Sequence, residues 1–194
     1  MSLFRRGLLR HVATAAAAVL LGAGITSCSA TVAGGGDNGY ITGQGSVDTI
    51  TPADRKGVPT LKGAALGGGT VSLASHRGKI VVINVWAAWC PPCRAEADAL
   101  VEAARKMPDV VFIGIDSRDN NAAAQAFVRS HHIPYPSLAD PDGSAMLAFY
   151  GMLAPNSLPT TMVLDTQGRI AAMVSGEITT LTLVGLVHDI ASGT

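Results

Sequence analysis

Cysteine is scarce in this chain, and the scarcity limits the metal and disulfide chemistry open to it. The three cysteines are Cys28 and the closely spaced pair Cys90 and Cys93. A structural zinc site needs further ligands, usually a second cysteine pair or two histidines a few residues apart, and neither follows the pair. A disulfide that closes so short a loop constrains the unfolded chain very little, which argues against a purely structural bridge. We therefore interpret Cys90 and Cys93 as a redox-active dithiol.

A surplus of charge and long apolar runs are also missing. Charged residues make up 14% of the chain, and its 14 basic residues balance its 14 acidic ones. Without the arginines of the N-terminus the balance becomes slightly acidic, so the sequence lacks the basic surplus expected of a protein that binds nucleic acid. The apolar run Val12–Ile25 is shorter than the ~20 residues that a membrane-spanning helix needs. The composition therefore predicts no nucleic-acid partner, and it argues against a membrane-spanning helix in this run.

The N-terminal residues are typical of a bacterial export signal. Basic residues, Arg5, Arg6 and Arg10, precede the apolar run. The segment Ile25–Cys28 resembles a lipobox, in which the cysteine becomes the lipid-modified first residue of the mature protein. We expect a signal peptide of the lipoprotein type over residues 1–27 and a lipid on Cys28; the alternative is an ordinary signal peptide with an incidental cysteine. The paired arginines also resemble a twin-arginine signal, which leaves the export route open.

The rest of the chain predicts a tether followed by one domain. Residues 28–46 are rich in glycine, serine, threonine and alanine and are expected to form a flexible tether. Residues 47–194 are long enough for one domain with a buried core. Residues 47–56 have no decisive pattern, so the sequence leaves their structure open.

Beyond residue 57 the pattern alternates between strands and helices. The expected strands are 61–66, 70–73, 79–86, 110–115, 137–139, 160–165 and 169–175, and the expected helices are 91–107, 120–130, 143–150 and 180–190. In the second helix, capped by Asp119 or Asn120, we expect Ala123, Phe127 and Val128 to face inward. Strands that alternate with helices and end in a hairpin predict an α/β fold with a mixed sheet covered on both faces.

The segment Trp89–Cys93 joins the expected strand 79–86 to the helix that follows it. At a helix N-terminus, unpaired N–H groups and the positive end of the helix dipole favour a thiolate. We therefore expect Cys90 to be an exposed nucleophile and Cys93, one turn further along, to resolve mixed disulfides. Such a dithiol exchanges disulfides with other proteins.

Several motifs together resemble those of the thioredoxin-fold family. Residues 79–93 are similar to its strand and active-site turn, and Asn84 and Pro91-Pro92 indicate the TlpA/ResA branch of membrane-tethered extracytoplasmic thioredoxins. Further marks of that branch are Gly78-Lys79, Arg94–Glu96, Asp140–Gly143, Leu158–Thr161, Leu164-Asp165 and Gly168. The resemblance covers about residues 58–192. It implies a thioredoxin-like fold that contains, between Asp116 and Ala139, the central insert of the branch. The strands 61–66 and 70–73, joined by Gly67–Gly69, predict an N-terminal hairpin added to this fold.

The resemblance also implies roles for residues around the dithiol. Pro159 is expected in the cis form, with the backbone of Leu158 turned outward to pair with an extended substrate strand. Trp89 is expected to form an apolar rim on which the partner rests. Asn84 replaces a buried aspartate that relays protons in many thioredoxins, and Glu96 becomes the candidate that influences the cysteine pKa values. The alternative for Glu96 is a solvated surface residue.

Together these observations predict a bacterial lipoprotein, anchored on the outer face of the cytoplasmic membrane, that exchanges disulfides with protein substrates and needs no bound cofactor. The resemblance implies reduction of the haem-binding cysteines of apocytochrome c, with electrons from a transmembrane electron-donor protein. One open alternative is an oxidase that forms disulfides in secreted proteins. Another is a copper-binding metallochaperone that adds a distal histidine to the cysteine pair. We interpret His131 and His132 as surface residues, so no histidine has a convincing position for copper.

Overall fold

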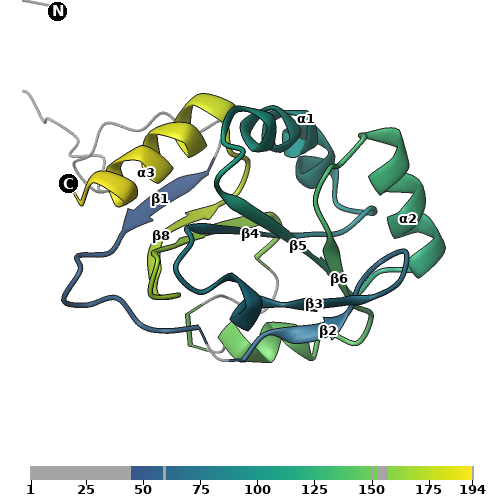
Figure 1. Cartoon of the computed structure of the whole chain (residues 1–194). Coiled ribbons are helices and arrows are strands. Elements are labelled where there is room, and N and C mark those ends of the chain that lie inside the picture. The colour runs from purple at the N-terminus through teal and green to yellow at the C-terminus, as the bar shows by residue number, and fades with distance from the viewer. Residues whose placement is uncertain (1–44, 59, 150, 153–156, 194) are drawn as a thin grey trace, which may run out of the picture. The chain divides into compact units, whose positions relative to one another are not determined.

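The computed structural model describes residues 45–58, 60–149, 151–152 and 157–193. The expected signal peptide, Cys28 and nearly all of the expected tether lie outside these ranges. Within them, one mixed sheet has the strand order β1-β8-β7-β4-β5-β6, with helices packed against it (Figure 1). The α/β architecture expected from the sequence is confirmed.

The strand that leads into the dithiol, β4, lies inside this sheet. The strands are β1 (Ser46–Thr49), β4 (Val81–Trp86), β5 (Val111–Ser117), β6 (Ser137–Asp140), β7 (Thr160–Leu164) and β8 (Ile170–Ser175). β4 pairs in parallel with β5, and β5 with β6, whereas β7, β8 and β1 continue the other side of the sheet in antiparallel pairs. Every residue of β4 is buried. A strand covered on both faces and paired on both edges accounts for the near-continuous apolar run in the sequence.

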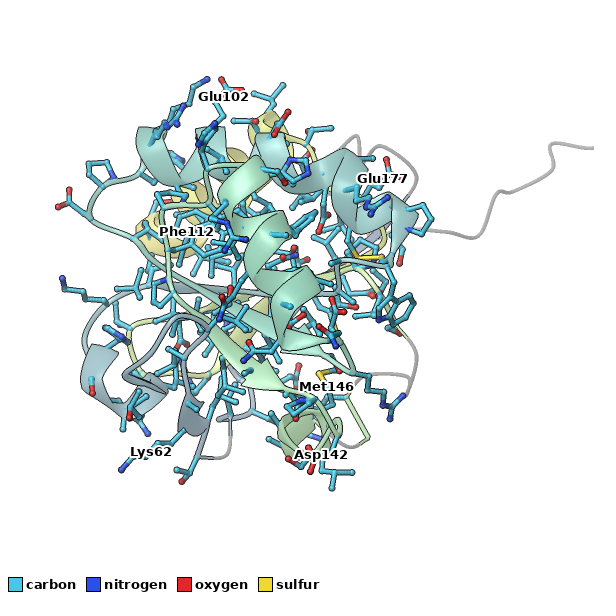
Figure 2. The ribbon with its side chains drawn as sticks, turned by 90° about the vertical axis from the view of Figure 1, so that its right-hand side faces the viewer. Lys62, Glu102, Phe112, Asp142, Met146 and Glu177 are labelled. Atoms are coloured by element: carbon cyan, nitrogen blue, oxygen red, sulfur yellow. A yellow bond between two sulfur atoms is a disulfide. The ribbon has the colours of Figure 1, made fainter. Side chains whose placement is uncertain are left out.

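Helices pack against one face of the sheet. They are α1 (Pro91–Lys106), α2 (Asn121–Ser130) and α3 (Thr180–Ser192). Leu100 of α1 and Leu183 of α3 share one buried cluster with Phe112 of β5, which Figure 2 labels within this layer. α2 packs at the end of β4, where the rings of Trp86 and Phe127 stack with centroids 4.7 Å apart. Trp86 is 2% exposed and belongs to the core.

The opposite face of the sheet is covered by the expected hairpin and by short 3₁₀ helices (Figure 1). The hairpin consists of β2 (Lys62–Ala64) and β3 (Thr70–Ser72) in antiparallel register, and the 3₁₀ helices are η1 (Leu73–His76) and η2 (Ala145–Phe149). Leu61, Val71 and Phe149 are buried here against Ile83 and Ile113 of the sheet. The hairpin is therefore part of the core rather than a loose appendage.

Two expectations about helices are wrong in detail. Ala123 is exposed, and Ala124 is buried instead. The face of α2 that meets the sheet runs through Ala124 and Phe127, a spacing that an apolar alanine run cannot single out. The expected helix over 143–150 is the shorter 3₁₀ helix η2. The cap of α2 is Asn120, whose side-chain oxygen accepts hydrogen bonds from two N–H groups of the first turn at 2.9 and 3.4 Å.

The segment left open by the sequence, residues 47–56, begins within an edge strand. β1 pairs antiparallel with β8, from Ser46 opposite Ser175 to Thr49 opposite Ala172. Of its four residues only Val47 is buried, and it joins the cluster beneath α1 and α3. Among the described residues no helix is both long and apolar enough to cross a bilayer.

Candidate active site

The dithiol lies where β4 gives way to α1. Cys90 is the N-cap of α1, Pro91 is the first residue of the helix, and the N–H of Cys93 points to the Cys90 sulfur at 3.2 Å. Cys90 and Cys93 form a disulfide, with Cα atoms 5.3 Å apart. The sequence therefore predicted correctly that the pair stands at a helix N-terminus, where N–H groups without helical partners favour a thiolate after reduction.

The expected exposure of Cys90 is wrong for this disulfide form. Only 3% of Cys90 is exposed, and Cys93 is equally buried, because both join a cluster with Trp86, Phe127 and the alanines of the turn. A cavity of about 290 Å³ nevertheless borders Cys90. Its lining consists of Trp89, Cys90, Pro91, Pro92, Ser117, Arg118, Met146, Ser157 and Leu158. A partner would therefore approach the sulfur through this cavity rather than across an open surface.

The residues expected beside the dithiol lie around this cavity. The Leu158–Pro159 peptide bond is cis, as predicted. Leu158 packs against the cluster that contains both cysteines. Trp89 is 58% exposed, and its indole N–H donates to the carbonyl oxygen of Arg118 at 3.1 Å. Trp89 and Leu158 therefore border the same cavity as Cys90.

Glu96 is buried within the domain, so its interpretation as a solvated surface residue is wrong. It is 2% exposed, and its two carboxyl oxygens accept hydrogen bonds from the Asn84 amide at 2.8 Å and from the N–H of Ile178 at 3.1 Å. Asn84 also donates to Thr161 at 3.2 Å. Burial outweighs the two hydrogen bonds and raises the pKa of Glu96 to about 8. Glu96 is therefore protonated at neutral pH.

Sequence reasoning missed two carboxyl groups beside the redox turn. Asp119, proposed only as a helix cap, instead accepts a hydrogen bond from the N–H of Ala88. The Ala88 carbonyl oxygen accepts a hydrogen bond from the Arg94 side chain at 2.9 Å, so the backbone N–H and the carbonyl of Ala88 are both hydrogen-bonded to side chains. Asp116, at the end of β5, is 2% exposed. Burial, and then the charge of Asp119, raise the pKa of Asp116 to about 8. The one feature of the sequence that could have indicated Asp116 is an acidic residue near the end of an apolar strand.

The histidines do not gather around the cysteine pair. His131 lies at the end of α2, where its Nδ1 is 3.1 Å from a carboxyl oxygen of Asp98 and its ring packs on Phe127. His132 is exposed. In the ranges that the structure covers, no group of three or more histidine, cysteine or acidic side chains could hold a metal ion.

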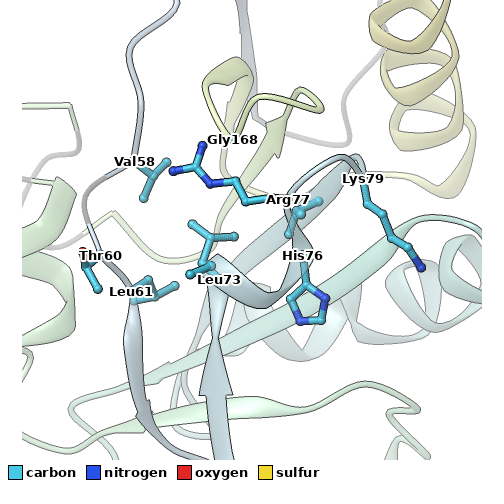
Figure 3. Close-up of a pocket in the computed structure, with 10 residues that line it drawn as sticks. Val58, Thr60, Leu61, Leu73, His76, Arg77, Lys79 and Gly168 are labelled. Carbon is cyan, nitrogen blue, oxygen red and sulfur yellow. The ribbon is translucent and has the colours of Figure 1, made fainter.

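A second cavity lies at the other end of β4. It is lined by Val58, Thr60, Leu61, Leu73, Ala74, His76, Arg77, Lys79, Val81 and Gly168, and Figure 3 shows His76, Arg77 and Lys79 around it. The Arg77 guanidinium donates to the carbonyl oxygen of Gln167 at 2.6 Å. Lys79 and Val81 precede or begin β4, whereas Cys90 follows its last residue. This cavity is therefore separate from the dithiol and contains none of the predicted site residues.

Known proteins share both the sequence pattern and the fold. Residues 55–173 match the family described as AhpC/TSA. "Thiol:disulfide interchange protein DsbE homolog" of Paracoccus denitrificans (strain Pd 1222) is 37% identical over 100 residues, which are 51% of this chain and 52% of that protein. "Thiol-disulfide oxidoreductase ResA" of Bacillus thuringiensis subsp. konkukian (strain 97-27) is 29% identical over 126 residues, or 64% and 70% of the two chains.

A solved structure also resembles this chain in its fold. The crystal structure of a secreted thiol-disulfide isomerase from Corynebacterium glutamicum superimposes with a TM-score of 0.70 at 29% identity, and covers 81% of this chain and 95% of that one. The similarity to the Paracoccus protein, by contrast, spans only about half of that relative's length. The comparisons therefore confirm the thioredoxin-like fold, and the ResA relative agrees with the resemblance found in the sequence.

Proposed function

Since this chain belongs to the AhpC/TSA family, we propose that it is a thiol-disulfide oxidoreductase that acts on proteins through Cys90 and Cys93. The observation that carries the proposal is the disulfide of these two residues at the start of α1, beside a cavity lined in part by Trp89 and Leu158. The similar proteins of Paracoccus, Bacillus and Corynebacterium are all named for thiol-disulfide chemistry, which supports the same assignment.

In the reductive direction the reduced dithiol supplies two electrons. The Cys90 thiolate attacks one sulfur of the substrate disulfide, which forms a mixed disulfide and releases one substrate thiolate to take up a proton. The Cys93 thiolate then attacks the Cys90 sulfur, breaks the mixed disulfide and releases the second substrate thiolate. The product is the Cys90–Cys93 disulfide of the present structure. Another protein dithiol must return two electrons before the next cycle.

Neighbouring residues support these steps. Trp89 offers an apolar rim to the substrate, and the backbone of Leu158, oriented by the cis bond to Pro159, pairs with an extended substrate strand. Glu96 follows Cys93 by one helical turn and influences its ionisation. Because burial raises the pKa of Glu96 to about 8, this group is neutral at pH 7 and does not then oppose a thiolate at Cys93.

We further propose a lipoprotein, anchored through Cys28 to the outer face of the cytoplasmic membrane, that reduces the haem-binding cysteines of apocytochrome c. The N-terminal segment and the resemblance to the TlpA/ResA branch support this task, and the secreted Corynebacterium protein supports a location outside the cytoplasm. Apocytochrome c must offer two free thiols to haem in a compartment where disulfides form readily. A membrane anchor would hold the dithiol near both its substrate and a transmembrane electron donor, which raises their effective concentrations.

One experiment tests both the chemistry and the substrate. Cells carry Cys93→Ser or, as the matched control, Cys90→Ser in place of the wild-type protein, and mixed disulfides are resolved on non-reducing gels. Without its resolving thiol, the Cys93→Ser protein is expected to accumulate a covalent complex with apocytochrome c through Cys90. The control is expected to accumulate several-fold less, and covalent haem staining of c-type cytochromes is expected to fall in both strains.

Two outcomes would contradict these expectations. More complex in the Cys90→Ser strain than in the Cys93→Ser strain would reverse the order of the two cysteines. Complexes with secreted disulfide proteins, together with normal haem staining and under-oxidised secreted proteins, would make the oxidase the better assignment.

A further inference from the structure

Asp116 is a buried acid that the chemistry above does not use. It is the last but one residue of β5, lies directly opposite Trp86 of β4, and is 2% exposed. One carboxyl oxygen, Oδ1, finds no hydrogen-bond partner among the residues that the structure describes. Its side chain lies close enough to that of Asp119, three residues further along, for the two carboxyl groups to share a hydrogen bond when one of them is protonated. A buried carboxyl group with a single carboxyl partner is costly, because burial disfavours its charged form.

The partner of Asp116 holds the turn that carries the nucleophile. Asp119 accepts from the N–H of Ala88, two residues before Cys90, and from its neighbour Asn120 at 2.6 Å. In the same loop, the carbonyl oxygen of Arg118 accepts a hydrogen bond from the indole N–H of Trp89. The loop that follows β5 is therefore attached to the redox turn at two successive residues.

A buried carboxyl group and a half-buried one that hydrogen-bond to each other share a proton, because one of them must donate. The acidic groups that act on Asp116 are Asp119, in this loop, and Asp140, at the end of β6. The Arg118 side chain lies against Gly143. Burial and the two acidic neighbours raise the pKa of Asp116 to about 8, so Asp116 is the partner that keeps the proton at neutral pH.

We propose that Asp116 is a positioning residue of the redox centre: its protonated carboxyl group donates to Asp119, holds that carboxylate on the Ala88 N–H, and so fixes the turn that carries Cys90. Only the expected effect of Asp116 on the rate of thiol-disulfide exchange at Cys90 rests on the proposed function. The hydrogen-bonded chain from Asp116 to Ala88 can be tested without any substrate.

The test uses the oxidised protein, in which the cysteines form the disulfide and do not titrate. Hydrogen exchange of the Ala88 amide is followed by NMR across pH 8 and corrected for the intrinsic pH dependence of exchange. In the wild type, ionisation of Asp116 sets two carboxylates against each other, so the protection of Ala88 is expected to fall on the order of tenfold above pH 8. In Asp116→Asn, whose amide donates at every pH, the protection is expected to stay constant. In Asp119→Ala it is expected to be low throughout.

Glu96→Gln serves as the matched control, because it removes the other buried acid with a pKa of about 8. It is expected to keep the wild-type titration of Ala88. Protection that does not change with pH in the wild type, or that changes equally in Asp116→Asn, would overturn the proposal.

The kinetic test uses Asp116→Ala, which is expected to slow thiol-disulfide exchange at Cys90 by about tenfold, with recovery in Asp116→Asn. Equal rates in all three proteins would overturn the link to Cys90. Should Asp116→Ala fail to fold, the pH dependence of the exchange rate in wild type and Asp116→Asn decides, since only the wild type is expected to show the Asp116 titration. If Ala88 titrates as expected but the wild type exchanges with no protein disulfide, the proposed function fails and the hydrogen-bonded arrangement stands.

Discussion

At the scale of single residues, Glu96 shows how burial sets the protonation state of an acid. Its carboxyl group receives one hydrogen bond from Asn84 and one from the N–H of Ile178, and both favour the ionised form. Desolvation is the larger effect, so the pKa rises from 4.5 to about 8. Between these values the folded protein keeps a proton that the unfolded chain releases. A raised pKa therefore contributes stability that is complete below pH 4.5 and is lost as the pH rises toward 8.

We predict that Glu96→Gln flattens this loss of stability with pH. A difference of one bound proton changes the free energy of unfolding by up to about 1.4 kcal/mol per pH unit, and a glutamine does not titrate. The measurement is urea denaturation of the oxidised protein at several values between pH 4.5 and 8. The matched control is Glu102→Gln on the same helix, because Glu102, which Figure 2 labels, is exposed and pairs with Lys106. A slope in Glu96→Gln as steep as in the wild type would show that Glu96 is ionised in the folded protein.

At the scale of elements, two neighbouring residues at the start of α2 have different roles: one caps the helix, and the other contacts the redox turn. Asn120 caps the helix through its side-chain oxygen. Asp119, which the sequence made an equal candidate for the cap, is directed to the redox turn instead. An asparagine cap satisfies N–H groups that the first helical turn leaves without carbonyl partners. One short segment therefore both begins α2, through Asn120, and binds the N–H of Ala88, through Asp119.

Replacing the cap, Asn120→Ala, is predicted to lower the free energy of unfolding by about 1 kcal/mol. The adjacent change Asn121→Ala is the matched control, because Asn121 is the exposed first residue of the helix rather than its cap. Its effect is expected to stay within about 0.5 kcal/mol. Urea denaturation of both oxidised variants at one pH measures the difference. Equal losses would mean that the side chain of Asn120 contributes nothing specific as a cap.

At the scale of the whole molecule, the proposed anchor decides where the dithiol acts. Membrane affinity grows by about 0.8 kcal/mol for each buried CH₂ group of an attached lipid, and stable anchoring takes two signals, such as two chains. We predict that the wild type incorporates labelled palmitate and fractionates with membranes, and that Cys28→Ala does neither. Cys93→Ala, which removes a cysteine from the redox pair, is expected to behave like the wild type. Identical labelling and fractionation of wild type and Cys28→Ala would refute the lipid at this residue.

The sequence by itself determined the features that depend on local spacing or on short motifs. The apolar run of β4, the helix that begins at Pro91 and the hairpin around Gly67–Gly69 follow from periodicity and turn residues. The cis bond before Pro159 and the fold followed from the resemblance of several motifs to one family. In each case the decisive information lies within a few neighbouring residues or in a motif that other proteins share.

Only the tertiary structure decided which of the polar residues became buried. Glu96 meets Asn84, 12 residues away, and Ile178, 82 residues away, and this enclosure raises its pKa. Asp119 meets Ala88 across 31 residues, and β1 finds its place only by pairing with β8. The burial of a side chain depends on segments that the chain brings from far along the sequence. A local pattern contains no information about that enclosure, because the same acidic residue on a helix can face either water or a neighbouring strand.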